Sequence, residues 1–163
     1  GDSMTLYATG IIAWLRSQTD IPFIDTFEPG VRFKDLIERR REALTCELFL
    51  TGVNAVGEDG TLHWLDMIGN RIAPIAFGPR KVVLVAGRNK IVRDTAEAYT
   101  RIREIAAPQN VARHEGFKTP CAMTGRCHDC NSPQRICNER LILHKCHPTG
   151  RITVVLINDE LGL

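Results

Sequence analysis

The stretch Lys81-Val82-Val83-Leu84-Val85-Ala86-Gly87 decides the fold class of this chain. It is rich in β-branched residues and uninterrupted, and the chain breaker Gly78-Pro79 comes shortly before it. A continuous apolar run of this length is typical of a strand buried on both faces, as in a parallel sheet covered by helices. We therefore predict a buried strand of an α/β domain over residues 81–87.

Strands and helices alternate on both sides of this stretch, which indicates a mostly parallel sheet flanked by helices. Upstream, the spacing of apolar residues predicts helices over 5–16 and 33–44, and a compact apolar run predicts a strand over 48–53. Downstream, the pattern predicts a helix over 94–107. The remaining predicted elements are strands at 22–24, 61–65, 141–145 and 152–157, and a short helix at 70–77.

The downstream helix has clear start and stop signals. Asp94 is a good N-cap, and Pro108 is expected to end the helix because its ring cannot continue the hydrogen-bond ladder. The spacing places Ala98, Ile102 and Ile105 on the inward face.

Size and composition indicate one globular domain. The chain has 163 residues, 44% hydrophobic and 25% charged, with a formal net charge of +2. A nearly neutral chain gives no support for a nucleic-acid or anionic-membrane partner. No apolar run approaches the roughly 18 residues that span a bilayer, and no secretory signal opens the sequence. We therefore expect a cytoplasmic protein in a reducing compartment.

Four of the six cysteines lie in the polar stretch TPCAMTGRCHDCNSPQRICN, residues 119–138, inside a loop that we expect over 117–140. Their spacing is C-x5-C-x2-C-x6-C, and the two-residue insert at the centre lets two sulfurs bind one tetrahedral ion. The sequence therefore predicts a metal site with four ligands, filled by zinc or an iron–sulfur cluster. The predicted ligands are Cys121, Cys127, Cys130 and Cys137.

The spacing does not decide what the four sulfurs do. It matches neither the usual zinc ribbon nor the bacterial ferredoxin run. A redox-active Cys127–Cys130 pair and packed or disulfide-tied cysteines without an occupant remain alternatives. His128 can replace one sulfur or simply be exposed.

A second group of residues is suited to binding a small anion. Small residues before the first helix, Gly1, Ser3 and Thr5, would let backbone N–H groups approach an anion, although Asp2 opposes a phosphate there. Ligands of open α/β sheets bind beyond the carboxyl ends of the strands, where other polar residues of this chain follow strand runs or turns. The alternative is that these residues belong only to turns and solvated loops. The candidates in that region are Asn54, Asp59, Asn70, Arg71 and Lys90.

Together these segments resemble the lactate-utilisation (LUD) domain family. The resemblance runs through TGVNAVGEDGTL, DMIGNRIAPIAFGPRKVVLVAGRNKIV, the cysteine stretch and GRITVVLINDELGL. The initial GDSMTL looks like a Gly-Gly-Ser-Met-Thr segment of the family, with Asp2 in place of a glycine. The cysteine stretch is a signature of one branch.

The resemblance implies a Rossmann-like α/β fold of the ribose-5-phosphate isomerase and CoA-transferase type, with the cysteine-rich loop as an insertion. In that fold, Gly1, Ser3 and Thr5 would lie at the phosphate-binding position. The chain is then a single LUD-type domain over 1–163 that lacks an initial strand and helical segment, which would leave the parallel sheet with an uncovered edge or a gap.

The resemblance also implies a function. We expect an accessory or electron-transfer component of organic-acid (lactate) utilisation, with iron–sulfur oxidoreductase subunits as partners. The alternative is an enzyme or sensor that binds a phosphorylated or CoA-like metabolite at the N-terminal loop and the strand-end crevice. The sequence shows no flavin or dinucleotide fingerprint, leaves open whether the protein is an enzyme, and is compatible with self-association.

Overall fold

The computed structural model describes residues 3–163, and the chain divides into two compact units. The first unit contains the chain up to Gly52, together with Ala73–Asn89 and Cys146–Gly162. The second unit contains Val53–Ile72 and Lys90–Lys145, together with Leu163.

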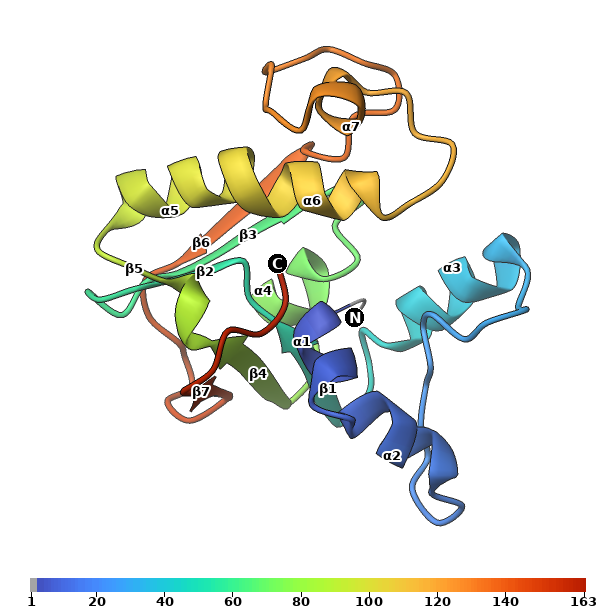
Figure 1. The fold of residues 1–163 in the computed structure, drawn as a ribbon. Helices are drawn as coiled ribbons and strands as arrows, with labels where there is room; N and C mark the ends of the chain where they lie inside the picture. Colours follow the sequence, from blue (N-terminus) through green and yellow to red (C-terminus); the bar gives the residue numbers. More distant parts are fainter. Residues whose placement is uncertain (1–2) are drawn as a thin grey trace. The chain divides into compact units, whose positions relative to one another are not determined.

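The first unit is built on a three-stranded parallel sheet with the order β1-β4-β7 (Figure 1). Its strands are β1 (Leu48–Gly52), β4 (Lys81–Gly87) and β7 (Ile152–Ile157). β4 lies between the other two, and Val82, Leu84 and Ala86 along it are fully buried. The strands predicted over 81–87 and 152–157 are therefore confirmed at the same residues.

Short helices accompany this sheet. Gly10, with φ of 74°, separates α1 (Met4–Ala8) from α2 (Ile11–Ser17), so the predicted helix over 5–16 is interrupted. Leu6 of α1 and Ile12 of α2 pack with Val85 of β4 in the core of this unit. The helix α3 (Phe33–Glu42) forms where it was predicted, but it has no buried residue.

Arg151 ties the start of β7 to the neighbouring α4 (Ile72–Ala76). Its guanidinium group donates hydrogen bonds to the carbonyl oxygens of Pro74, Ile75 and Pro79 at 2.8, 2.7 and 2.9 Å. The residues at 22–24, by contrast, form no strand. Pro22 has no N–H for a sheet ladder, and Phe23 packs against the core from an irregular segment, so the predicted strand there is wrong.

The second unit contains a four-stranded mixed sheet with the order β5-β2-β3-β6. β2 pairs in parallel with β5, whereas β3 is antiparallel to both β2 and β6. The predicted return strand over 61–65 is confirmed as β3. The strands are β2 (Ala55–Gly57), β3 (Leu62–Asp66), β5 (Ile91–Val92) and β6 (Glu139–Leu143).

A continuous helical rod crosses this sheet (Figure 1). It comprises α5 (Thr95–Arg101), the π-helix η2 (Ile102–Ala106) and α6 (Ala107–Ala112). Pro108 lies in the first turn of α6 and does not end the rod. Proline is tolerated in a first turn because it has no N–H to donate, and here the preceding π-turn already changes the hydrogen-bond pattern. The extra residue per π-turn also moves the inward face, so Ala106 is buried and Ile105 is 44% exposed, contrary to the prediction for Ile105.

The expected class, a mixed α/β fold with a mostly parallel sheet flanked by helices, is confirmed. The strands nevertheless form two sheets, and the second contains antiparallel pairs. Over the described residues, no helix is long and apolar enough to cross a membrane.

Candidate functional site

The cysteine loop (residues 117–140) begins with one helical turn. Thr119 caps α7 (Pro120–Thr124) by accepting a hydrogen bond from the Ala122 N–H at 3.4 Å, and Pro120 occupies the first turn. Gly125, with φ of 71°, ends the helix in the left-handed conformation that glycine adopts most readily. The remainder of the loop up to Asn138 has no regular helix or strand.

Hydrogen bonds hold the base of the loop in place. The Lys118 N–H donates to Oε1 of Gln134 at 2.7 Å, which joins two segments 16 residues apart. At its exit, the Asn138 N–H and side chain donate to the carbonyl oxygens of Asp66 and Met67 at 2.9 and 3.0 Å. The loop is therefore attached directly to the end of β3.

Arg135 organises the inside of the loop. Its guanidinium group donates to the carbonyl oxygens of Cys130 and Cys137 at 2.6 and 2.9 Å, and also contacts Oδ1 of Asp129 at 3.3 Å. Asp129 has a φ of 44°, unusual for a residue other than glycine. A single arginine thus fixes the backbone at two of the predicted ligands.

Arg103 reaches the loop from the π-helix η2. Its Nε and Nη2 atoms donate to Sγ of Cys127 at 3.3 and 3.2 Å, and Nη2 lies 3.2 Å from Oδ1 of Asp129. Nη1 donates to the Tyr99 hydroxyl at 2.6 Å, and the guanidinium group covers the Tyr99 ring. The bond to Cys127 is the largest cause that raises the pKa of Arg103. Two N–H groups on one sulfur stabilise negative charge there.

The four loop cysteines lie in one neighbourhood. Burial raises the pKa of the Cys137 thiol to about 11; Arg135 opposes this effect, while the thiols of Cys121, Cys127 and Cys130 add to it. All six cysteines of the chain are free thiols and are partly buried. Among the described residues, however, no three histidine, cysteine or acidic side chains converge closely enough to hold one ion.

The other loop residues occupy simpler positions. Nε2 of His128 lies 2.8 Å from Oγ1 of Thr124, and the histidine is exposed. Oγ1 of Thr119 lies 3.3 Å from Sγ of Cys121. Sequence reasoning did not identify Arg103 or Arg135. The only available signal was that Arg103 follows Tyr99 at helical spacing and that Arg135 lies among the cysteines.

The predicted N-terminal anion loop lies in the first unit. Gly1 is outside the described residues. The Ser3 hydroxyl caps the five-residue helix α1 by accepting from the Leu6 N–H at 3.4 Å, and Oγ1 of Thr5 donates to the Leu161 carbonyl at 3.3 Å. Both hydroxyls therefore form hydrogen bonds to the backbone of this unit.

The predicted strand-end residues all lie in the second unit. Oδ1 of Asn54 accepts from the Leu65 N–H at 3.1 Å and from Nη2 of Arg71 at 3.3 Å. Lys90, the last residue of the 3-10 turn η1 (Arg88–Lys90), is buried. Asn70 is half-buried in the turn before Arg71.

Asp59 has a different setting from these residues. Its carboxylate accepts from the N–H and the hydroxyl of Thr61 at 2.9 and 2.6 Å, and these two bonds are the main causes that lower the pKa of Asp59. It therefore closes the turn before β3, which agrees with the turn alternative given for this residue.

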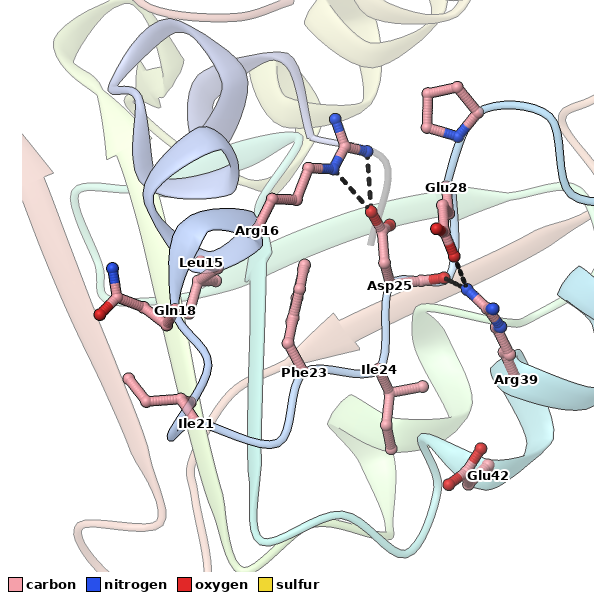
Figure 2. Close-up of a pocket in the computed structure, with 11 residues that line it drawn as sticks. Leu15, Arg16, Gln18, Ile21, Phe23, Ile24, Asp25, Glu28, Arg39 and Glu42 are labelled. Carbon is pink, nitrogen blue, oxygen red and sulfur yellow. Dashed lines mark hydrogen bonds and ion pairs between the residues drawn. The ribbon is translucent and has the colours of Figure 1, made fainter.

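An open hollow of about 760 Å³ lies in the first unit (Figure 2). None of the residues that line it was a candidate site residue in the sequence analysis. Arg16 is paired with Asp25 at 2.7 Å, and Arg39 is paired with Glu28. Because these cations and anions pair with each other, the hollow has no clear preference for ligand charge. Its apolar lining consists of Leu15, Ile21, Phe23, Ile24 and Pro29.

The structure is that of an α/β protein in which four of the six cysteines lie between residues 117 and 140. A model of the LUD domain family matches residues 1–157. The chain therefore belongs to the LUD domain family, which associates it with lactate utilisation. No curated protein and no solved structure matches the chain.

Proposed function

We propose that this chain is a component of organic-acid utilisation in which Cys121, Cys127, Cys130 and Cys137 together hold a zinc ion or an iron–sulfur cluster. It would belong to the branch of the LUD family that has this cysteine signature. As an accessory or electron-transfer component, it would work with iron–sulfur oxidoreductase subunits. The observation that carries the proposal is the gathering of four thiols in one loop whose backbone is held by Arg135.

The donor set fits such an occupant. Thiolates are the preferred ligands of zinc and of iron–sulfur clusters, and four of them around either group leave a net negative charge. Arg103 already donates two N–H groups to Cys127, and the Cys127 sulfur also accepts from the Asp129 N–H at 3.5 Å. Hydrogen bonds from cations and amides to ligating sulfurs are the kind of support that tunes such sites.

We expect binding to bring the four sulfurs onto one occupant, because zinc and iron–sulfur clusters are held directly by their ligating thiolates. The left-handed residues Gly125 and Asp129 lie within the segment that would move. Metal binding that orders its own ligands contributes directly to folding free energy.

The test is metal and sulfide analysis of protein purified without oxygen, together with its absorption spectrum. We expect stoichiometric zinc, or iron with labile sulfide and visible absorption. Cys127→Ala and Cys130→Ala should each lose most of the occupant, whereas Cys46→Ala, outside the loop, should retain it.

Protein that contains no metal, and takes up none after anaerobic reconstitution, would overturn the proposal. Equal retention in Cys127→Ala and Cys46→Ala would show that the occupant lies elsewhere. Thiol titration then distinguishes a disulfide-tied loop from packed cysteines without an occupant. A loop tied by disulfides has fewer titratable thiols than the six free cysteines of this structure.

A further inference from the structure

The side chain of Arg103 connects the helical rod to the cysteine loop. All three of its guanidinium nitrogens are engaged: Nε and Nη2 donate to Sγ of Cys127 at 3.3 and 3.2 Å, and Nη1 donates to the Tyr99 hydroxyl at 2.6 Å. The side chain is 22% exposed, although an arginine is charged at every physiological pH. This guanidinium group is therefore held in one position against a predicted ligand.

Groups from two directions orient Arg103. On the rod, Tyr99 lies one helical turn earlier, and its ring centroid is 5.1 Å from the guanidinium carbon, a cation–π contact. Arg140 of β6 covers the same ring at 4.6 Å, which holds the ring in turn. On the loop, Oδ1 of Asp129 lies 3.2 Å from Nη2 of Arg103. Because the rod and the loop both contribute, the fork of two N–H groups on the sulfur is oriented in advance.

Cys127 consequently differs from the other predicted ligands. Its sulfur accepts from a cation twice and from the Asp129 N–H at 3.5 Å. Cys121 instead contacts a neutral hydroxyl, Oγ1 of Thr119, and burial is the main influence on the Cys137 thiol. N–H groups on a sulfur stabilise its negative charge and make it a weaker electron donor to a metal. The four thiols are therefore electronically unequal.

The charges beside the loop add to this effect. Arg103 and Arg135 contact the same oxygen, Oδ1 of Asp129, at 3.2 and 3.3 Å. Two cations and one anion leave a net positive charge beside the thiols. Four thiolates around zinc or a cluster carry net negative charge, and a cluster that accepts an electron becomes more negative still. Nearby positive charge therefore favours the reduced form of a cluster.

We propose that Arg103 is a positioning residue that sets the electronic properties of the cysteine site, acting through Cys127 and held in place by Tyr99. Arg103 weakens electron donation from the Cys127 sulfur and raises the reduction potential of an iron–sulfur occupant. This inference rests on the proposed function, since it requires an occupant held by the four cysteines. It adds that one residue outside the loop controls the site.

The test compares the full chain with Arg103→Gln after anaerobic loading in two separate arms. The first arm uses Co²⁺, whose sulfur-to-cobalt charge-transfer absorption reports how tightly the sulfur electrons are held. We expect this absorption to move to lower energy in Arg103→Gln and the Co²⁺ affinity to fall about tenfold, the lower end of the usual cost of losing an outer-shell partner. The second arm uses iron with sulfide. There we expect the reduction equilibrium to shift about tenfold toward the oxidised form, a fall of about 59 mV for one electron.

Three further variants separate this role from general effects. Arg93→Gln removes the same charge from a side chain that is 75% exposed near the start of the rod, and it should change neither readout. Tyr99→Phe retains the ring but loses the hydroxyl, so it should shift both readouts in the same direction as Arg103→Gln, by less. Arg103→Lys retains the charge without the fork, so it should recover more of the potential than of the charge-transfer energy.

The outcomes distinguish this inference from the proposed function. Uptake of neither Co²⁺ nor an iron–sulfur cluster by the unaltered protein would overturn both; if one is taken up, the readout of that arm decides. Arg103→Gln that loads with unchanged spectrum and potential would overturn the role of Arg103 alone. Lower occupancy with unchanged properties in the loaded fraction would do the same, because it would show that Arg103 only stabilises the loop. If Arg103→Gln does not fold, unchanged readouts in Tyr99→Phe would overturn the inference, and equal shifts in Arg93→Gln would assign the effect to net charge.

Discussion

At the residue scale, His63 is the clearest titratable group that the sequence left without a role. It is fully buried on β3, and its Nε2 atom lies 2.8 Å from Oγ1 of Thr61. Because the Thr61 hydroxyl donates to Asp59, its oxygen accepts from Nε2–H, which assigns the neutral tautomer. Nδ1 is buried and has no partner among the described residues, so a proton there would have no acceptor.

This arrangement predicts a loss of stability in acid. Burial lowers the pKa of His63 below 6.5, with a further contribution from Arg140, so the folded state binds fewer protons than the unfolded state. The free energy of unfolding should therefore fall as the pH drops through about 6.5, by about 1.4 kcal/mol per unit of pKa difference, and level off below the folded pKa.

Urea unfolding between about pH 8 and about pH 5 measures this slope. His63→Gln, which cannot titrate, should have a flatter slope, whereas exposed His128→Gln should retain the original one. Equal slopes in the original protein and His63→Gln would assign the acid sensitivity to other groups.

At the element scale, the stability of the short helix α7 depends on its N-cap. Thr119 is 1% exposed, and its hydroxyl accepts from Ala122 and contacts Cys121. Thr119→Ala should cost about 1 kcal/mol, the usual loss on removing a threonine cap. Thr100→Ala on the exposed side of α5 is the matched control and should cost little, since alanine favours helices. Urea unfolding of both variants checks this, and similar losses would argue against the capping role.

The edge strand β7 predicts self-association. Val154, Val155 and Leu156 are 36%, 41% and 54% exposed, and among the strands of residues 3–163 β7 pairs with β4 alone. An exposed apolar edge strand pairs readily with other chains.

Val155→Lys should therefore lower the association constant measured by sedimentation velocity without unfolding the protein. Phe77→Lys adds the same charge at a residue that is 90% exposed and lies outside the sheet, and it should have a smaller effect. If both variants reduce association equally, net charge and not the strand edge is responsible.

At the scale of the whole molecule, the two units should respond differently to metal removal. The cysteine loop belongs entirely to the second unit, and its exit is hydrogen-bonded to the end of β3. Hydrogen exchange should therefore speed up in the loop and β6 when a chelator is added to the loaded protein, while β4 should stay protected. The Cys127→Ala variant should show fast loop exchange with or without chelator. Uniform acceleration in both units would contradict local coupling.

Much of this architecture could be predicted because the relevant information is local. The uninterrupted apolar run of β4 and the alternation around it are enough to predict a mixed α/β protein, and the density of cysteines identifies the loop. Pro108 was misjudged because its tolerance depends on a π-turn, which has no strong local signal. Phe23 was misjudged because an apolar residue can pack against a core from an irregular segment.

The sequence by itself determined the α/β class, the main strands, the LUD family and the set of thiols available for a site. Only the tertiary structure decided that the strands form two sheets, that Arg103 reaches Cys127, and that Arg71 and Arg101 both donate to Asn54. The physical reason is the distance along the chain over which each interaction acts. Strand and helix signals arise from neighbours within a few residues, whereas these hydrogen bonds join groups 17 to 47 positions apart, and such groups meet only when the strands and helices between them are in place.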